Sequence, residues 1–436
     1  MISFSTKNTG EVKIFTDNIE EEALKQIYDI AESPFCEKHI RIMPDVHAGK
    51  GITIGFSGII DKYINPEHVG CDIGCNVTVE FFNKPIPEKD YALFEHKIKN
   101  TVPMGFNINE HSKVTWKDVA QRFNKAIQKA RSTNPEFIND VRFNTEKDIS
   151  NWLKRIKMDE GVFYKSISTC GGGNHYLEYD VNEELKKYCI NVHCGSRNLG
   201  LKVFNYWNKI AKQSTPNKED IKHLTEEVKS RVKDKKKIGD ELRKAKDEYQ
   251  KTLHPGWLSD ENLKGYLTDM VICQEYARLN HDIIHKTIRD IYSKMTGAHS
   301  EGIIETMHNY IDFSGTQPIV RKGAVRSYKD EIFILPFNMR DGIAICVGKS
   351  NEDWNCTAPH GAGRAMSRNM AKKNLSVETF KKEMNDAGIY TTTADSSTLD
   401  ESPDAYKPTQ EIIDNVKDTC DILYFMKPKI NLKAAE

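Results

Sequence analysis

The sequence predicts an α+β protein, built as a single large mixed domain with central β-sheets, peripheral helices and an inserted, charged helical arm. Three observations carry this prediction. Short apolar or alternating segments that end in Gly- and His-rich loops recur along the chain, as is typical of strands in a sheet. Stretches with apolar residues at helical spacing lie between them. One segment, residues 216–252, is rich in Lys and Glu and poor in large apolar residues.

The first elements follow from hydrophobic spacing. Residues 19–32 carry isoleucine and alanine near one helical face, which predicts a surface helix. The following stretch, IRIMPDVHAGKGITIGFSGII, predicts strand pieces that Gly-rich turns interrupt. NVTVEFF alternates apolar and polar positions and predicts a strand, whereas residues 89–100 and 116–131 predict helices.

Three later segments each combine a strand with a loop. YKSISTCGGGNHYLEYDV predicts a strand, a glycine loop and a second strand, and KYCINVHCGSRNLGLKVFNYWNKIAKQ predicts a strand, a loop and a helix. DEIFILPFNMRDGIAICVGK predicts two strands around a turn. Each His- or Gly-rich stretch therefore falls where a strand ends in a loop, and loops held by a sheet commonly carry binding groups.

The charged segment 216–252 predicts a helical hairpin with its turn near Lys237–Gly239. Its charges have two interpretations: a solvated face, or an arm that contacts RNA or a partner protein. The sequence contains no internal repeat and no long Pro- or Ser-rich linker. We therefore expect residues 1–436 to form one domain with this hairpin inserted in it.

Composition restricts the class of protein. The 436 residues are 38% hydrophobic and 29% charged with a formal net charge of zero, so nucleic-acid binding would need a local basic surface. No run of 18 apolar residues predicts a membrane span, and the N-terminus lacks a signal-peptide pattern, so we expect a cytoplasmic protein. Ten scattered cysteines predict reduced thiols rather than a disulfide framework.

The polar side chains at the predicted loops include groups that commonly bind metal ions. Thiolate, carboxylate and several imidazoles make a set of transition-metal ligands: imidazole suits zinc, manganese, iron and copper, and carboxylate favours manganese or magnesium. They do not match a closed structural zinc site, which prefers two to four cysteines. Cys71 and Cys75 have three residues between them, unlike a redox or zinc-knuckle pair. The polar side chains at these loops are Asp45, His47, Asp72, Cys75, Asn174, His175, Glu178, His193, Arg197, His308, Asn309, His360 and Arg364.

The glycine runs GGGNH and HGAGR favour an anion such as phosphate, because glycine lets backbone N–H groups approach closely; taken alone, each is also typical of an ordinary turn. Arg197 and Arg364 each offer a guanidinium that can fork onto phosphate oxygens. Metal and phosphate ligands together predict phosphoryl or nucleotidyl transfer. Histidine serves as a nucleophile in such chemistry, and His360 in the HGAGR stretch is the best placed candidate.

The blocks MPDVHAGKG, VGCDIGC, GGGNHYLE, VHCGSRNLG, MHN and APHGAGR occur in this order and resemble the RtcB family of RNA ligases, from about residue 40 to the C-terminus. The resemblance implies a ligase dependent on GTP and Mn²⁺ that joins RNA with a 3′-phosphate or 2′,3′-cyclic phosphate to RNA with a 5′-hydroxyl. It implies that His360 attacks GTP to form a histidine–GMP intermediate, and that the guanylate then moves to the RNA 3′-phosphate.

The resemblance also implies roles for individual residues. Two Mn²⁺ ions would share Cys75, with Asp72 and His175 completing one ion and His193 and His308 the other. The guanine nucleotide would contact Asn174, His175, Glu178, His308, Asn309, Asn338, Met339, His360, Gly361, Ala362, Gly363 and Lys433. Arg197 would bind an RNA phosphate, and Asp45 would support the active site from beside it.

One departure from the family pattern stands out. Many members carry Pro-Gly-Ser-Met before the histidine motif, where this chain has Pro336-Phe337-Asn338-Met339, and the loss of the glycine predicts altered nucleotide contacts. An archease-like activator is a further candidate partner, and we expect a monomer. Two alternatives stay open: a metal-dependent phosphatase or phosphodiesterase of RNA ends, and a catalytically weak RNA-binding protein. RNA repair and tRNA splicing are both open as the pathway.

Overall fold

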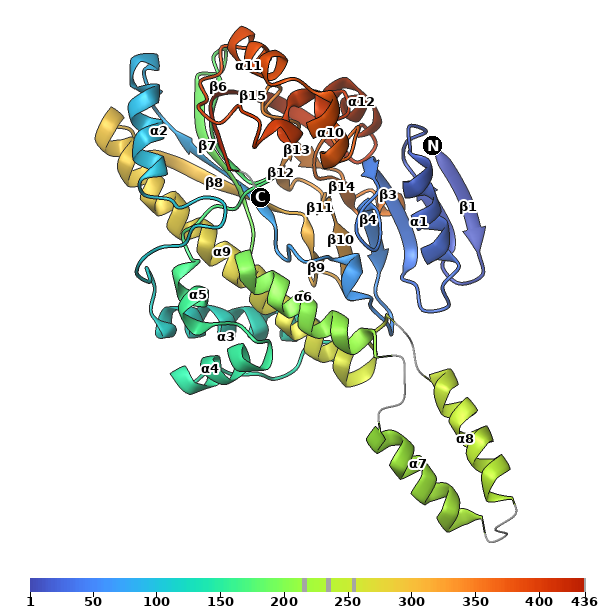
Figure 1. Cartoon of the computed structure of the whole chain (residues 1–436). Helices are drawn as coiled ribbons and strands as arrows, with labels where there is room; N and C mark the ends of the chain where they lie inside the picture. Colours follow the sequence, from blue (N-terminus) through green and yellow to red (C-terminus); the bar gives the residue numbers. More distant parts are fainter. Residues whose placement is uncertain (214–217, 233–236, 253–255, 435–436) are drawn as a thin grey trace.

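A computed structural model describes residues 1–213, 218–232, 237–252 and 256–434 (Figure 1). Its α-helices are α1 (Glu21–Ala31), α2 (Tyr91–Lys99), α3 (Trp116–Thr133), α4 (Glu146–Arg155), α5 (Glu160–Lys165), α6 (Arg197–Ala211), α7 (Lys218–Arg231), α8 (Ile238–Thr252), α9 (Asp260–Thr296), α10 (Arg368–Asn374), α11 (Val377–Asp386) and α12 (Thr409–Asn415). Its strands are β1 (Ile2–Thr6), β2 (Gly10–Ile14), β3 (Lys38–His47), β4 (Ile54–Ile59), β5 (Asn76–Phe82), β6 (Tyr176–Asn182), β7 (Lys187–Cys194), β8 (Ser300–Met307), β9 (Asn309–Asp312), β10 (Ile319–Lys322), β11 (Ala324–Arg326), β12 (Ile332–Pro336), β13 (Ile343–Gly348), β14 (Thr357–Pro359) and β15 (Cys420–Lys433).

Two large sheets lie at the centre, and this arrangement confirms the predicted α+β class. One sheet has seven strands in the order β12-β13-β15-β6-β7-β5-β8, with every neighbouring pair antiparallel. The other has six strands in the order β1-β2-β3-β4-β10-β9, and β11 pairs with β14 beside them. Helices lie around the sheets, with the long α9 running diagonally across the molecule (Figure 1).

The register of the seven-stranded sheet gathers residues that are far apart in the sequence. β7 pairs with β5 on one side and with β6 on the other, both antiparallel, so the end of β7 lies beside the starts of its neighbours. His193 in β7 is opposite Val77 in β5 and Tyr176 in β6. Met307 at the end of β8 is opposite Asn76. The residues just before β5, just before β6 and just after β8 therefore meet at one edge.

The helix α9 supports this edge from behind. About half of its residues are buried, and it ends at Thr296. The next residue, Gly297, has a φ of 66°, the left-handed backbone that commonly closes a helix. Asn280 of α9 is fully buried and contacts two loops at once. Its side-chain oxygen accepts from the backbone N–H of Ser168 at 2.7 Å, and its amide donates to the carbonyl of Gly195 at 3.3 Å. The two loops beside the site are thus fixed relative to each other.

The charged segment carries the two helices α7 and α8, which project from the body of the molecule (Figure 1). Of the predicted turn Lys237–Gly239, only Lys237 precedes α8, and residues 233–236 lie outside the described residues. The insertion leaves and re-enters the body at one point, because the backbone N–H of Gly256 donates to the carbonyl of Ala211 at 2.7 Å.

The strand predicted over YKSISTC is wrong. Tyr164 and Lys165 end helix α5, and no strand occurs before β6 in this stretch. Ser168 has a φ of 68°, which breaks an extended backbone, and the N–H groups of Ser168 and Thr169 donate to the side chain of Asn280 instead of to a neighbouring strand. A side chain from a distant helix therefore replaces the sheet hydrogen bonds that the predicted strand would have made.

Candidate functional site

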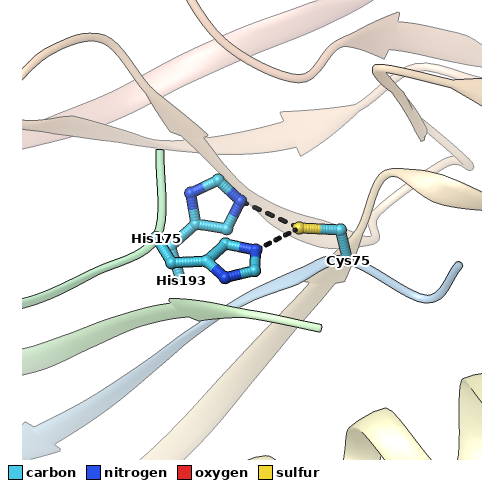
Figure 2. A group of neighbouring side chains, drawn as sticks. All are labelled: Cys75, His175 and His193. Carbon is cyan, nitrogen blue, oxygen red and sulfur yellow. Dashed lines mark hydrogen bonds between the residues drawn. The ribbon is translucent and has the colours of Figure 1, made fainter. Parts of the chain in front are cut away.

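A thiol and two imidazoles converge at the sheet edge described above (Figure 2). Cys75 Sγ lies 3.3 Å from Nε2 of His175 and 3.2 Å from Nε2 of His193. All three side chains are buried, and their ligand atoms lie within 4.8 Å of one another. Soft and borderline ligands at this separation form a site suited to a transition-metal ion.

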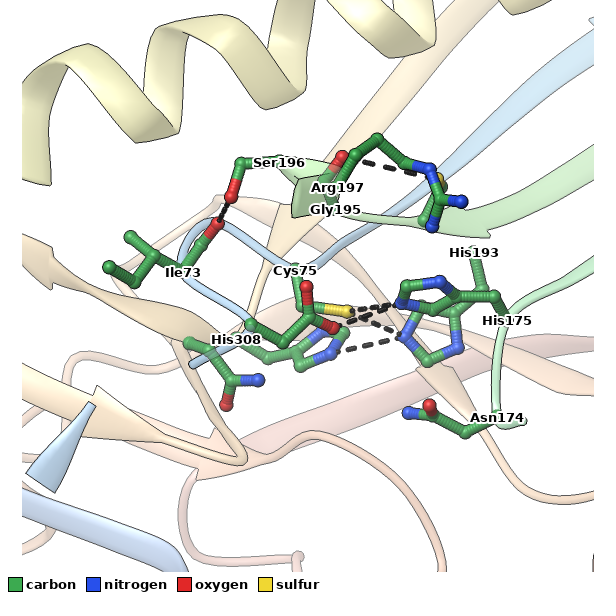
Figure 3. A network of polar contacts seen from close by, with 12 residues as sticks. Ile73, Cys75, Asn174, His175, His193, Gly195, Ser196, Arg197 and His308 are labelled. Atoms are coloured by element: carbon green, nitrogen blue, oxygen red, sulfur yellow. Dashed lines mark hydrogen bonds and ion pairs between the residues drawn. The ribbon is translucent and has the colours of Figure 1, made fainter. Parts of the chain in front are cut away.

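Two further predicted ligands, Asp72 and His308, touch this trio, and Figure 3 shows His308 beside it. Oδ2 of Asp72 lies 3.0 Å from Nε2 of His175, and Nε2 of His308 lies 3.2 Å from Nε2 of His193. The structure therefore brings together all five residues that the sequence predicted as metal ligands. Cys71, in contrast, is exposed.

Burial and neighbouring charges set the protonation of these donors. Burial lowers the pKa of His193 and of His308 well below the ordinary histidine value, so both imidazoles are neutral. Burial acts to raise the pKa of Asp72, but His175 outweighs it and holds that pKa at about 2. Burial raises the pKa of Cys75 well above its usual range. Burial acts to lower the pKa of His175, but the neighbouring Asp72 outweighs it and raises that pKa. Because metals bind the carboxylate and the neutral imidazole, the residues fit a cation that displaces the protons of His175 and of the Cys75 thiol.

A pocket of about 470 Å³ opens beside the cluster. This volume is typical of small-molecule and cofactor sites. Of the predicted nucleotide contacts, those that line it are Asn174, Glu178, His308, Asn309, Asn338, Met339, His360, Gly361, Ala362, Gly363 and Lys433. His193 lines it as well, so the pocket borders the cluster of five predicted metal ligands, which we call the metal-type cluster. His175, the remaining predicted nucleotide contact, lies in the cluster and not in the pocket lining.

His360 is held by a buried carboxylate. Oδ2 of Asp45 lies 2.6 Å from Nδ1 of His360 and accepts from the backbone N–H of the same residue at 3.1 Å. The imidazole ring also lies 5.0 Å, centre to centre, from that of His308. Because an ionised carboxylate can only accept, Nδ1 of His360 donates this hydrogen bond, and in the neutral imidazole Nε2 then carries the lone pair.

Glycines permit two close approaches in the site. A Cβ on Gly363, whose φ is 73°, would lie 2.2 Å from the carbonyl oxygen of Asp45. A Cβ on Gly171 would lie 2.0 Å from Nδ1 of His175 and 2.5 Å from Nη1 of Arg197. These glycines are required by packing around the histidines, in addition to any role in approaching an anion.

Lys433 ties the C-terminal strand to the glycine loop. Its ammonium lies 3.4 Å from the carbonyls of Gly173 and Asn174 and 3.1 Å from the buried Glu401. Burial acts to raise the pKa of Glu401, but Lys433 and two arginines hold it at about 2, so this carboxylate is ionised. The lysine is thereby fixed at the pocket wall.

Glu178 is a second carboxyl group at the pocket wall, in a different environment. Asn191 and Asn431 donate side-chain amide hydrogens to its two oxygens. Burial nevertheless raises its pKa to about 7, with Lys433 acting in the opposite direction. Near neutral pH this group therefore exists in both protonation states.

Arg197 lies on the other side of the cluster from Asn174 in Figure 3. Its Nη2 donates to the carbonyl of Gly105 at 2.7 Å and its Nε to Thr169 Oγ1 at 3.0 Å. In the described part of the chain no carboxylate forms an ion pair with it, so its charge is available to an anion.

The remaining predicted residues take supporting positions. The side-chain oxygen of Asn309 accepts from the backbone of Gly323 at 2.8 Å, and that of Asn338 accepts from the backbone N–H groups of Arg340 and Asp341. Met339 is buried in a small apolar cluster.

Phe337 stands where many family members have a glycine. Its side chain is buried against Phe425 and lines the pocket.

Sequence reasoning missed the buried glutamate Glu401, which organises one end of the pocket. Glu401 accepts from Arg364, Arg368, Lys433 and the hydroxyl of Tyr406. The stretch LDESPDAYKP contains this glutamate and the tyrosine, but the three cationic partners of Glu401 lie more than 30 residues away from it in the chain. Only the folded arrangement makes the network visible.

Within the residues that the structure describes, no helix is both long and apolar enough to cross a membrane. The mixed α+β fold and this pocket define a class of protein: an enzyme whose site places metal-type ligands beside a histidine that a carboxylate orients. The sequence profile of the family described as tRNA-splicing ligase RtcB matches residues 26–434, and the chain belongs to this family. The match confirms the resemblance that the motif blocks predicted.

Curated relatives agree over nearly the whole chain. The RNA-splicing ligase RtcB of Escherichia coli (strain K12) is 28% identical over 453 residues, covering 98% of each chain. The tRNA-splicing ligase RtcB of Archaeoglobus fulgidus is 24% identical, covering 91% of this chain and 88% of its own. The RNA-splicing ligase RtcB homolog 1 of Entamoeba histolytica is 24% identical, covering 94% and 83%.

Proposed function

We propose that the chain is a GTP-dependent RNA ligase that joins RNA ending in a 3′-phosphate or 2′,3′-cyclic phosphate to RNA with a 5′-hydroxyl, through a guanylate carried on His360. Family membership supports RNA ligation. The observation that carries the finer proposal is the contact between Asp45 Oδ2 and His360 Nδ1, because it leaves the lone pair of Nε2 at the pocket wall.

The pocket residues would divide the work. Nε2 of His360 attacks the α-phosphorus of GTP, pyrophosphate leaves, and the Nδ1 proton stays on the hydrogen bond to Asp45. The 3′-phosphate oxygen of the RNA then takes the guanylate from the histidine, and the 5′-hydroxyl displaces GMP. A cyclic phosphate is first opened to a 3′-phosphate. Glu178 and Lys433 at the pocket wall would hold the guanine base.

The five clustered donors would hold two Mn²⁺ ions, with Cys75 between Asp72 and His175 on one side and His193 and His308 on the other. Such ions, when bound, offset the charge of the triphosphate during attack. Arg197 would take an RNA phosphate, because its guanidinium lies beside His175 without an acidic partner in the described residues.

Labelling with α-³²P-GTP and Mn²⁺ tests the proposal. Wild-type protein should retain label through denaturing electrophoresis, and His360→Ala should not. A chase with 3′-phosphate RNA and 5′-hydroxyl RNA should give a joined product. Absence of label from the wild type, or equal label on His360→Ala, contradicts the mechanism. Release of a free 3′-phosphate from cyclic-phosphate RNA without GTP and without joining would favour an RNA-end phosphodiesterase instead.

A further inference from the structure

Phe106 is the most exposed large apolar residue among those described, with 86% of its surface accessible. It lies in the loop between α2 and α3. Single exposed apolar residues are ordinary on protein surfaces, so exposure alone indicates nothing. What distinguishes Phe106 is that its loop contacts Arg197 of the site.

The loop that carries Phe106 is fixed on both sides. On the N-terminal side the carbonyl of Pro103 accepts from the backbone of Cys170 at 2.8 Å, and the N–H of Gly105 donates to the carbonyl of Gly171 at 3.1 Å. On the other side the amide of Asn109 donates to the carbonyls of Lys165 and Ile167 at 3.1 and 2.8 Å. The aromatic side chain therefore projects from an anchored loop rather than from a fraying end.

The residue before Phe106 contacts Arg197, which has no acidic partner among the described residues. The carbonyl of Gly105 accepts from Nη2 of Arg197 at 2.7 Å. Arg197 itself has a φ of 56°, a conformation that side-chain-bearing residues rarely adopt and that is often retained where it serves function. Phe106 follows Gly105 directly, so its Cα lies about 3.8 Å from the Cα of the residue that contacts Arg197.

The same loop reaches the metal-type cluster through Gly171. The absence of a side chain there lets Nη1 of Arg197 and Nδ1 of His175 occupy the space that a Cβ on Gly171 would fill. An RNA phosphate bound by Arg197 would thus lie beside the cluster, and the nucleoside attached to it would extend toward solvent past Phe106.

We propose that Phe106 is a stacking residue for a nucleobase of single-stranded RNA, namely the base adjoining the phosphate that Arg197 holds. Phe106 follows directly the residue whose carbonyl accepts from Arg197. Exposed aromatic rings combined with cationic groups are the means by which proteins bind single strands without reading sequence, because every base has a flat face. The inference rests on the proposed function for the identity of the ligand as RNA and for the role of Arg197.

Fluorescence anisotropy with short labelled RNA, without GTP, tests this stacking. One RNA ends in a 3′-phosphate and another begins with a 5′-hydroxyl, and each is compared with a version that lacks the terminal base. Phe106→Ala should weaken binding of at least one strand by about 5- to 100-fold, while Phe106→Trp should retain it. Leu185→Ala, which removes another exposed apolar side chain on the turn between β6 and β7, is the matched control and should bind as wild type does.

Removal of the terminal base distinguishes stacking from a general loss. Wild-type protein should bind the abasic strand as weakly as Phe106→Ala binds the intact one, and Phe106→Ala should not distinguish the two strands. Equal binding of both RNAs by Phe106→Ala and wild type, or an undiminished effect of base removal in the variant, overturns the proposal. Labelling by α-³²P-GTP is read separately: if wild type takes no label, the proposed function fails, whereas labelled Phe106→Ala shows an intact nucleotide site.

Discussion

Asp45 binds His360 twice through one carboxylate oxygen, at Nδ1 of the ring (2.6 Å) and at the backbone N–H (3.1 Å). The same oxygen lies 3.3 Å from the backbone nitrogen of Gly361, which donates to it. Three donors on one buried acceptor fix both the orientation of the ring and its tautomer. The arrangement resembles the part of a catalytic triad in which an aspartate orients a histidine.

Asp45→Asn tests this relationship. The amide can donate to Nδ1, which would move the ring proton to Nε2 and remove the nucleophilic lone pair. We expect the rate of guanylylation to fall on the order of 10²- to 10⁴-fold while the fold is retained, as when a triad aspartate is replaced. The measurement is the time course of α-³²P-GTP labelling. A rate within about threefold of wild type would contradict the tautomer assignment, provided the thermal midpoint is unchanged.

Glu178 predicts a pH dependence of nucleotide binding. Burial raises its pKa to about 7, so the carboxylate becomes the main form only above that pH. A carboxylate accepts hydrogen bonds from a guanine edge better than a carboxylic acid does. GTP affinity should therefore rise as the pH increases from 6 to 8, measured by calorimetry or equilibrium binding on His360→Ala, which does not turn over.

The variant Glu178→Gln serves as the comparison in this experiment. It keeps the size of the side chain and removes the titrating group, so its weaker affinity should be flat across the same pH range. An equal pH dependence in Glu178→Gln would assign the titration to another group. Preserved GTP affinity at pH 8 would exclude Glu178 as a contact to the base.

Cys75 predicts proton release on metal binding. Its pKa is raised by burial, so the metal-free protein carries a thiol, and a cation must displace that proton. Mn²⁺ affinity should increase with pH, and Cys75→Ser should lose most of the bound metal because an alcohol is a poorer bridging ligand. Metal analysis after dialysis measures the loss. Chelation of wild type should abolish labelling and added Mn²⁺ should restore it, whereas full labelling of the chelated protein would contradict the metal requirement.

How far the sequence predicts the fold differs from element to element. The strand NVTVEFF and the helix over residues 19–32 follow from period alone, and the structure confirms both as β5 and α1. YKSISTC is also predicted as a strand, but the N–H groups of Ser168 and Thr169 bond to Asn280, which lies 111 residues further along the chain from Thr169. Periodicity reports which residues face a core, and it carries no information on which distant side chain satisfies a backbone.

The site shows the same division. Short motifs identified Cys75, His193 and His360 because each stands in a block of characteristic residues, and the antiparallel register then brings the first two together. Sequence reasoning missed Glu401 because its role depends on distant partners. One of them is Lys433, whose ammonium forms a 3.1 Å ion pair with it. Sequence reasoning also missed Phe106, because the exposure of a side chain is known only from the folded structure.

We predict that the body of the protein folds and takes up label without the helical arm formed by α7 and α8. Its described charges pair along the helices themselves, as in Lys244 with Glu241 at 3.0 Å and Lys222 with Glu226 at 4.0 Å. Such exposed pairs contribute little to stability. Since Gly256 donates directly to Ala211 at the base of the insertion, residues 214–255 can be replaced by a short Gly-Ser linker without separating α6 from α9.

This excision should leave the thermal midpoint and the labelling rate unchanged, because the arm projects away from the body that carries the pocket (Figure 1). RNA affinity should also stay unchanged, with the same dependence on salt, if the charges serve only solvation. Binding at several salt concentrations is the decisive measurement. An RNA contact made by Lys or Arg of the arm would instead appear as weaker binding and a shallower salt slope, because each lost phosphate contact reduces that slope by about one. Excision thus decides between the two interpretations of the charged segment.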